Sequence, residues 1–193
     1  LCTERSLDLR FPSGYLSFIV QLPLVSSSRM QPVRQILREQ SNTIYVAPFD
    51  DRPGKLFNGL QHCRSVIFIS SGRKSDDTSK VAVTRYHRWP SEVREYLFGQ
   101  FEYETIRSSS LLDPDQFPKY QGKIHQGVFD RIKNSDSTID VQLSARQTEH
   151  FIFYQEATQY WTKAVVGLPY YAKNSQVGAP AHGRYLYLRN TDI

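Results

Sequence analysis

The segment GYLSFIVQLPLVSSSRMQPVRQILREQ, Gly14–Gln40, begins with an almost unbroken apolar run and continues into a pattern with helical spacing. The apolar run Gly14–Leu24 predicts a strand that is buried on both faces within a parallel sheet. The serines that follow can cap a helix, and the apolar side chains after them have the spacing of one helix face: Val33, Ile36 and Leu37. We therefore expect a strand followed by a helix that ends near Gln40.

Two further strands are predicted downstream of this helix. NTIYVAPF, Asn42–Phe49, and SVIFIS, Ser65–Ser70, are short apolar runs, and the loop Asp50–Arg64 between them is rich in turn residues. The order strand, helix, strand, loop, strand predicts one α/β unit followed by a hairpin. This amounts to half of a sheet, and the polar cluster SSGRKSDDTSK closes it as an exposed turn.

The composition changes in the middle of the chain. Residues Lys80–Trp89 predict a further extended segment, and Pro90–Glu104 predicts a short helix opened by its proline and serine. Ser108–Lys123 is rich in Ser, Pro, Asp and Gly, so we expect domains at 1–107 and 108–193. IHQGVFDRIKN then predicts a helix, and TEHFIFYQEATQYW and GRYLYLRN predict strands. The second domain is therefore expected to be α+β and incomplete, and a chain that starts at Leu1 rather than Met is expected to be a fragment of a larger protein.

Composition narrows the class of protein. The chain has 193 residues, of which 39% are hydrophobic and 22% charged, and no apolar run is long enough to cross a bilayer. A membrane role is therefore not expected. The two cysteines, Cys2 and Cys63, have no metal-site spacing, so we expect a reducing, cytoplasmic protein without a disulfide framework or a bound metal.

The charge pattern favours an anionic partner. The net charge is +5, and basic residues gather in one early region beside loops, in a chain with 12 Tyr and 11 Phe. The basic candidates for phosphate contacts are Arg29, Arg34, Arg52, Lys55, Arg64, Arg73 and Lys74. Basic loops beside aromatic rings suit nucleic acid, although a solvated surface over a tyrosine-rich core explains the same composition equally well.

No catalytic motif lies within the chain. The sequence contains no GxGxxG, Walker-type phosphate loop, HExxH or GxSxG pattern. Asp50 and Asp51 precede RPGK, whose arginine and lysine can neutralise them, so a structural turn is favoured over an acid/base pair. His62, His87 and His182 have no partner nucleophile in sequence. A complete active site is therefore not expected in this chain.

The order of these features resembles a known family. GYLSFIVQLPLVSSSRMQPVRQIL, then IYVAPFDDRPGKLFNGLQHCRSVIFI, then YHRW resemble the later half of the catalytic domain of adenine-specific DNA methyltransferases of bacterial restriction-modification and phage-defence systems. FIFYQEATQYWTKAVVGLPYY resembles the start of their target-recognition region. The resemblance covers nearly the entire chain, but its motifs are patterns of apolar and turn residues and are moderately specific.

The resemblance implies a fold and a division of labour. The fold would be α/β, the distal part of a Rossmann-like methyltransferase sheet followed by an incomplete α+β target-recognition region. The family's S-adenosylmethionine turn and its Asn/Asp-Pro-Pro loop precede this region, and neither occurs in the sequence. The chain would therefore act as part of the enzyme, inactive by itself, with double-stranded DNA and the upstream part of the same protein as partners and S-adenosylmethionine bound outside it.

The resemblance also implies a role for Phe57. In the family, an aromatic or apolar residue in the matching loop packs on the target adenine after the base leaves the duplex, and Gly54 and Gly59 are expected to leave room for it. The alternative is that Phe57 or Leu56 plugs the loop onto the sheet. His62 is expected to fix the loop by a polar contact.

Three other interpretations remain open. Tyr154, Tyr160 and Trp161 could stack on DNA, although such a cluster is more often core. A non-catalytic DNA-binding or specificity module is the alternative to a methyltransferase part, and an interaction domain with no DNA role is the third. A glycine-rich turn and a Pro-Pro loop encoded upstream would distinguish a methyltransferase part from a non-catalytic module.

Overall fold

The computed structural model describes residues 2–60, 62–72, 79–106, 114–155, 164–168, 170, 172–173, 175–177 and 183–189. The chain forms two compact units, Leu1–Asn134 and Ser135–Ile193. The predicted turn at Ser70–Lys80 lies largely outside the described residues.

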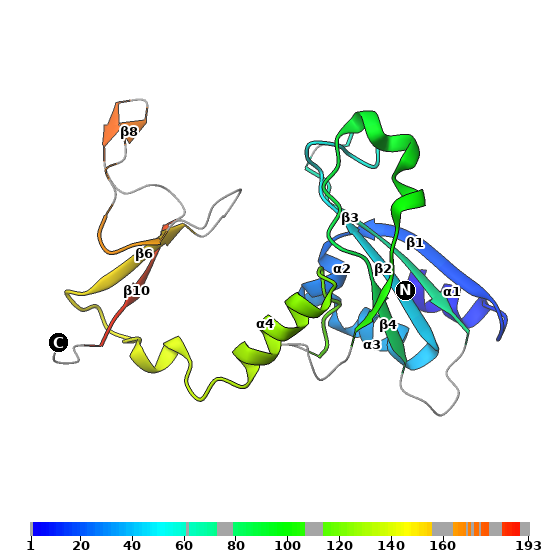
Figure 1. Ribbon diagram of the computed structural model, residues 1–193, viewed down its shortest axis with the longest axis horizontal. Helices are drawn as coiled ribbons and strands as arrows, with labels where there is room; N and C mark the ends of the chain where they lie inside the picture. Colours follow the sequence, from blue (N-terminus) through cyan, green and yellow to red (C-terminus); the bar gives the residue numbers. More distant parts are fainter. Residues whose placement is uncertain are drawn as a thin grey trace. The chain divides into compact units, whose positions relative to one another are not determined.

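A five-stranded mixed sheet is the centre of the first unit (Figure 1). Its strands follow the order β1-β3-β2-β4-β5 and comprise β1 (Tyr15–Gln21), β2 (Thr43–Phe49), β3 (Ser65–Ser71), β4 (Lys80–Val83) and β5 (Glu104–Ile106). β2 and β4 pair in parallel, and the other pairs are antiparallel. Because β3 is antiparallel to both of its neighbours, β1, β2 and β4 all run in the same direction. The expected α/β class is confirmed.

Strand β1 differs from its prediction. It is an edge strand that pairs antiparallel with β3, and its residues alternate between exposed and half-buried. The prediction of a strand buried on both faces in a parallel sheet is therefore wrong. The apolar run reflects one face that packs on the core, through Leu16, Phe18 and Val20, and a second face that carries Tyr15 and Ile19 into solvent.

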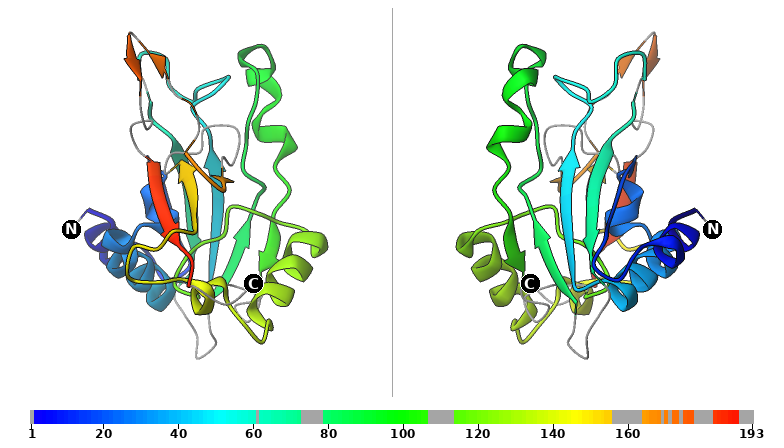
Figure 2. Two further views of the ribbon diagram at one scale, coloured as in Figure 1. Left: turned by 90° about the vertical axis from the view of Figure 1, so that its left-hand side faces the viewer. Right: turned by 90° about the vertical axis from the view of Figure 1, so that its right-hand side faces the viewer.

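Helices cover one face of the sheet (Figures 1 and 2). They are α1 (Cys2–Leu9), α2 (Pro23–Ser26), the short 3-10 turn η1 (Ser28–Met30) and α3 (Gln31–Gln40). Buried side chains from these helices, Leu7, Val25 and Leu37, pack with Val46 and Phe68 of the sheet. The predicted end at Gln40 is confirmed. The predicted serine cap is wrong, because Met30 is the N-cap of α3 and makes no side-chain bond, and a proline occupies the first turn.

A second, smaller core lies on the other face of the sheet. Ala47 and Phe49 of β2 pack there with Trp89 and Leu97, which belong to the segment after β4. That segment contains two 3-10 helices, η2 (Ser91–Tyr96) and η3 (Phe98–Gln100), where the sequence predicts one α-helix. Successive side chains of a strand thus point to opposite faces of the sheet, and each face has its own hydrophobic cluster.

The first unit continues past β5 into α4 (Lys123–Lys133), which is the helix predicted there. Phe117 is buried in the main core, and Tyr120 packs against it. The unit therefore extends beyond residue 107 as a folded body. The domain assignment 1–107 and 108–193 stays a prediction.

The second unit contains small antiparallel sheets. A 3-10 turn η5 (Ile139–Gln142) precedes the sheet β10-β6-β7, formed by β6 (Phe151–Gln155), β7 (Ala164–Val165) and β10 (Gly183–Tyr187). A separate pair joins β8 (Ala172–Lys173) to β9 (Gln176–Val177). Strands are present in both predicted segments, although residues 156–161 of the first lie outside the described residues, and Phe153 is the buried residue of β6. Tyr154 is half-buried on β6, whereas Tyr160, Trp161 and His182 lie outside the described residues.

Candidate nucleic-acid interface

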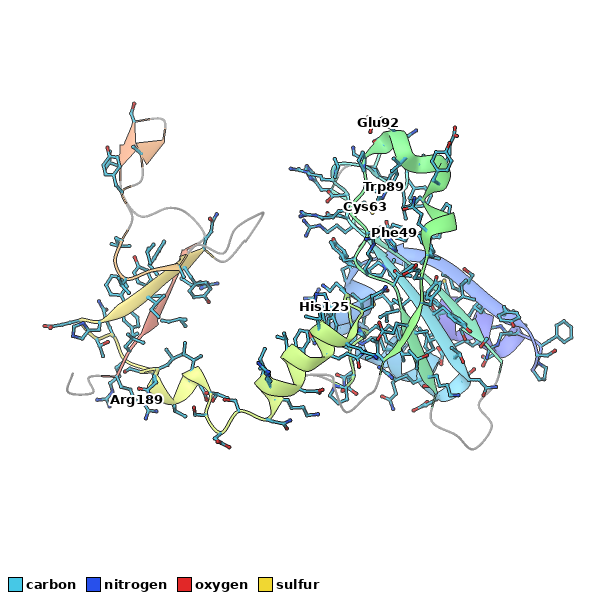
Figure 3. All side chains as sticks on the ribbon, viewed as in Figure 1. Phe49, Cys63, Trp89, Glu92, His125 and Arg189 are labelled. Carbon is cyan, nitrogen blue, oxygen red and sulfur yellow. The ribbon has the colours of Figure 1, made fainter. Side chains whose placement is uncertain are left out.

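Two segments meet at the carboxyl ends of the parallel strands. The β2–β3 loop, Asp50–Arg64, leaves β2 there, and the segment Thr84–Tyr103 leaves β4 there. Figure 3 places Cys63, Trp89 and Glu92 at this end of the sheet. In open α/β sheets, ligands bind outside the carboxyl ends of the strands, so this edge is the place to look for a site.

Buried carboxylates anchor the start of the loop. Asp50 is 4% exposed and accepts hydrogen bonds from Arg88 Nε at 2.7 Å, from the Asp51 backbone N–H at 2.8 Å and from Arg64 Nε at 3.1 Å. Burial raises the pKa of Asp50, but the bonds from Arg88 and Asp51 and the charge of Arg64 together hold that pKa below its ordinary value. The carboxylate is therefore a structural anion rather than a proton donor.

The structural turn predicted for these aspartates is present, but the cations are different ones. The sequence predicts neutralisation by the arginine and lysine of RPGK. Arg64 and Arg88 make the ion pairs instead. Sequence proximity is a poor guide here because β3 and the segment after β4 return to the same edge of the sheet.

The middle of the loop is held from a second direction. Gly54 lies against Trp89, and a Cβ at this position would come within 2.5 Å of the Trp89 carbonyl oxygen. The Arg94 guanidinium donates to the carbonyl oxygens of Lys55 and Leu56 and lies over the Trp89 ring. Gly54 therefore permits close packing, and the prediction that it leaves room for a base is wrong. Gly59 does fit that expectation, with a positive φ of 86° and open space around it.

Phe57 and Leu56 divide the two roles that the sequence leaves open. Leu56 is half-buried and packs on the cluster of Ala47 and Phe49. Phe57 is 42% exposed, and among the described residues no ring lies in stacking contact with it. Leu56 therefore plugs the loop onto the sheet, and Phe57 is presented to solvent from an anchored loop.

The predicted basic residues fall into three groups. Arg52 and Arg29 are exposed, Lys55 is half-buried, and Arg64 keeps 55% of its side chain exposed while it pairs with the aspartates. Arg34 is only 2% exposed and donates to the carbonyl oxygens of Asp115, Leu24 and Ser27, so its prediction as a phosphate contact is wrong. Arg73 and Lys74 lie outside the described residues.

His62 makes the expected polar contact. Its Nδ1 lies 3.1 Å from Nη2 of Arg52, and its backbone has a positive φ of 54°. Its Nδ1 is also 3.8 Å from an Asp51 oxygen. The contact joins the two ends of the loop, which favours a positioning role.

His87, for which the sequence predicts no role, lies at the carboxyl ends of the parallel strands. Its ring is buried and contacts Phe49 and Phe101, with centroid distances of 5.0 and 4.8 Å. Burial, together with the charge of Arg85, lowers the pKa of His87 to about 4. Only its place in the YHRW stretch could have drawn attention to it.

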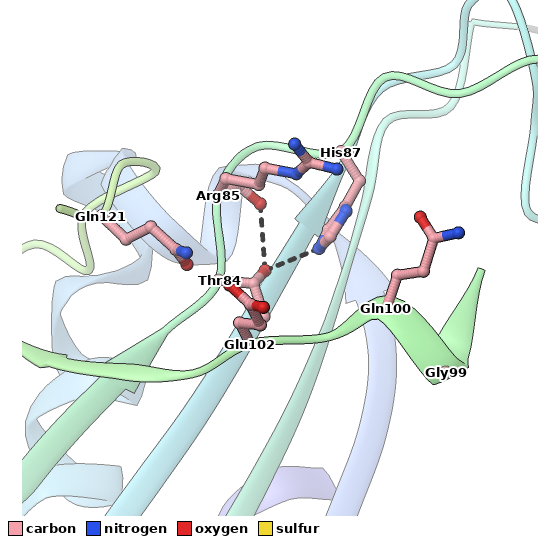
Figure 4. Close-up of a pocket in the computed structure, with 7 residues that line it drawn as sticks. All are labelled: Thr84, Arg85, His87, Gly99, Gln100, Glu102 and Gln121. Atoms are coloured by element: carbon pink, nitrogen blue, oxygen red, sulfur yellow. Dashed lines mark hydrogen bonds between the residues drawn. The ribbon is translucent and has the colours of Figure 1, made fainter. Parts of the chain in front are cut away.

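His87 also borders a cavity of about 460 Å³, shown in Figure 4. The cavity is lined by Thr84, Arg85, His87, Gly99, Gln100, Glu102 and Gln121.

In the described part of the chain, no group of three or more His, Cys, Asp or Glu side chains could hold a metal ion. Among the described helices, none is both long and apolar enough to cross a membrane.

Comparison with known proteins gives a limited result. The sequence matches no family model and no curated protein. The chain is similar to parts of solved structures that include the following three. The first is a DrdV–DNA complex, with a TM-score of 0.44 and 15% identity over 56% of this chain and 13% of that chain.

The other two structures are Type ISP restriction-modification enzymes. A nuclease-deletion mutant of LlaGI in complex with a DNA substrate mimic gives a TM-score of 0.47 and 12% identity, over 78% of this chain and 15% of that chain. The ATP-dependent enzyme LlaBIII bound to DNA gives a TM-score of 0.42 and 14% identity, over 78% of this chain and 11% of that chain. The chain thus spans 11% to 15% of the length of these three proteins, and at these scores the likeness assigns no activity.

Proposed function

We propose that this chain is the DNA-contacting part of a S-adenosylmethionine-dependent, adenine-specific DNA methyltransferase of a restriction-modification system. In this proposal Phe57 stacks on the target adenine after the base leaves the duplex. Arg52, Lys55 and Arg64 contact the flanking phosphates, and Arg29 extends the basic surface. The upstream part of the same protein carries the methyl donor and the Asn/Asp-Pro-Pro loop.

One observation carries the proposal, namely the half-exposed Phe57 ring on a loop that is anchored at several points. The Asp50 ion pairs, the Gly54–Trp89 contact and the Arg94 bonds restrain the loop, so little ordering is left to occur on binding. A flipped base has lost its stacking neighbours, and a fixed aromatic face replaces part of that energy. Arg52, Lys55 and Arg64 lie on the same loop, where they can contact the phosphates on either side of the flipped base.

The described residues do not fit a cradle for S-adenosylmethionine. The carboxyl ends of β1, β2 and β4 lead into Leu22–Pro23, Asp50–Asp51 and Thr84–Arg85, none of which is a glycine-rich turn. The Asp50 and Asp51 carboxylates are buried and already paired with arginines. We therefore assign no methyl-transfer step to this chain, and its role is to bind and hold the base.

The test is binding of the purified chain to a duplex with an abasic site opposite adenine, compared with the fully paired duplex across a salt series. We expect affinity to fall with salt and the native chain to prefer the abasic duplex. Phe57→Ala should lose most of this preference, because stacking on one base contributes roughly 1–3 kcal/mol. Phe11→Ala is the matched control, since Phe11 is 81% exposed and precedes the start of β1, at the amino ends of the parallel strands and away from the β2–β3 loop.

The outcomes separate the proposal from its alternatives. Salt-dependent binding that is equal for both duplexes and unchanged by Phe57→Ala would leave a phosphate-binding module, the non-catalytic alternative. Arg52→Ala and Lys55→Ala should each reduce the salt slope by about one if both side chains contact phosphates. Absence of binding at every salt concentration contradicts the proposal for the isolated chain.

A further inference from the structure

The cavity beside His87 has no part in the stacking role of Phe57. It lies at the same edge of the sheet, and its lining comes from three segments: the turn after β4, the residues around η3, and Gln121 before α4 (Figure 4). We call it the His87 pocket. Its volume of about 460 Å³ lies within the range of sites for small ligands.

One wall of the His87 pocket is fixed in conformation and in protonation state. Thr84 Oγ1 donates its single hydrogen to the Arg85 carbonyl oxygen at 3.0 Å, so it can only accept from His87 Nε2 at 2.9 Å. His87 therefore carries its proton on Nε2, and the neutral ring is stacked against Phe49 and Phe101. This wall therefore presents a neutral imidazole that is held by ring contacts and by one hydrogen bond.

The remaining lining offers hydrogen-bonding groups whose charges cancel. Arg85 contributes one positive and Glu102 one negative charge, and Gln100 and Gln121 contribute carboxamides, each with donors and an acceptor. Gln121 Oε1 is buried and has no hydrogen-bond partner among the described residues, which is costly unless a ligand or water donates to it. Because the positive charge of Arg85 is balanced by Glu102, the lining does not favour an anionic phosphate over a neutral ligand.

We infer that the His87 pocket binds the hydrogen-bonding edge of an unpaired nucleobase. This inference rests on the proposed function and adds a base-reading site to it. A nucleobase is planar and neutral and carries donors and acceptors side by side, and carboxamide, carboxylate and guanidinium side chains are the groups that read such edges. Phe49, Leu56 and Phe101 belong to one packed cluster that contacts both His87 and the Phe57 loop. Both sites therefore lie at the same end of the sheet.

The chemistry of Glu102 sharpens the expectation. A carboxylate only accepts hydrogen bonds, so it favours a base with an exocyclic amino group. Deoxyadenosine, deoxycytidine and deoxyguanosine should therefore bind more tightly than thymidine, whose single donor, N3–H, lies between two carbonyl oxygens that the carboxylate repels. Glu102→Gln should reduce this discrimination about tenfold, the effect of losing a charge-assisted bond.

The experiment is a titration of the native 193-residue chain with each of the four nucleosides, followed by the NMR signals of the His87 ring. We expect saturable shifts, weakened about tenfold by Glu102→Gln and three- to tenfold by Gln100→Ala. The matched controls are Glu92→Gln and Gln35→Ala, exposed residues outside the pocket, which should bind as the native chain does. Absence of saturable shifts, or equal effects of Glu102→Gln and Glu92→Gln, would overturn the inference.

A second arm uses a duplex with one unpaired base and distinguishes the two proposals. Nucleoside binding together with a preference for the unpaired duplex that Phe57→Ala and Glu102→Gln each reduce supports both. Saturable nucleoside binding without any duplex binding supports the pocket and overturns the proposed DNA contact. Duplex binding that depends on Phe57 but not on Glu102, without nucleoside binding, retains the proposed function and overturns the base-reading pocket.

Discussion

At the scale of single residues, two buried ionisable groups lie at the carboxyl ends of the parallel strands, and the surroundings of each determine its charge. Asp50 is buried yet remains an anion because two arginines and a backbone N–H supply what water would supply. His87 is buried and, among the described residues, makes no ion pair with a carboxylate, so burial and the charge of Arg85 lower its pKa and the ring is neutral at pH 7. The two residues show that burial alone does not predict charge, since the partners decide it.

His87 makes stability dependent on pH. Its pKa is about 4 in the folded chain and near 6.5 when unfolded, so between these values the unfolded state binds more protons. Its contribution is fully present above pH 6.5 and is lost as pH falls towards 4, by roughly 3 kcal/mol. Urea unfolding of the native chain and of His87→Phe from pH 7 to pH 4.5 measures this, and parallel pH profiles for the two would contradict it.

Asp50 is the residue whose loss should loosen the β2–β3 loop most. Asp50→Asn removes the charge that pairs with Arg64 and Arg88 and should cost about 2–3 kcal/mol of unfolding free energy. It should also weaken the preference for the abasic duplex, because Phe57 is carried by the same loop. Asp8→Asn, an exposed aspartate on α1, is the control and should change stability by less than about 0.5 kcal/mol.

At the scale of elements, the sequence predicted where most strands and helices occur and that β2 and β3 form a hairpin, but it did not predict how β1 pairs. The positions of β2, β3, α3 and α4 agree with their patterns, because each has a clear period or an unbroken apolar run. β1 has an equally apolar sequence and still lies at the edge of the sheet, since pairing depends on contacts distant in sequence. The 3-10 turns after β4 follow from packing of Trp89 and Leu97 rather than from helix propensity.

The candidate site was predictable only in part. The family resemblance pointed to Phe57 in the turn-rich basic loop, but nothing in the sequence separates Phe57 from Leu56 as the residue that packs inward. Arg34 resembled any surface arginine on a helix, although three carbonyl oxygens from other elements bury it. The His87 pocket needs residues from three separate segments, so no local pattern could reveal it.

The fit between the β2–β3 loop and the segment after β4 depends on one glycine. In Gly54→Ala the added methyl group would lie 2.5 Å from the Trp89 carbonyl oxygen and 2.9 Å from its ring. The loop must move away from Trp89, so we expect a loss of about 1–3 kcal/mol and weaker discrimination of the abasic duplex. Gly127→Ala in α4 meets nothing within 4 Å and should be neutral or stabilising by up to about 1 kcal/mol. Equal melting temperatures for both variants would contradict this packing.

At the scale of the whole molecule, the first unit has unequal faces. One face is covered by α1, α2 and α3, whereas the other is covered, among the described residues, by the segment after β4 and by Leu56 of the β2–β3 loop, towards Phe49. Tyr15 and Ile19 on β1 remain 73% and 48% exposed. Among the described strands, β1 pairs on one side alone, so its other side offers unpaired backbone groups. An open edge next to an exposed apolar face is a site where further strands can add.

We therefore expect the isolated chain to self-associate through β1. A charge on an edge strand opposes strand addition because the ammonium group would have to lose its water. Ile19→Lys should thus shift sedimentation velocity profiles towards monomer with little loss of stability, since this side chain is already half-exposed. Ile124→Lys, on α4 with an exposure of 83%, makes the same change away from the edge and should leave association unchanged. A native chain that sediments as a monomer and melts cooperatively would show that the edge is protected by other means, and equal effects of the two lysines would assign the association to general hydrophobicity rather than to β1.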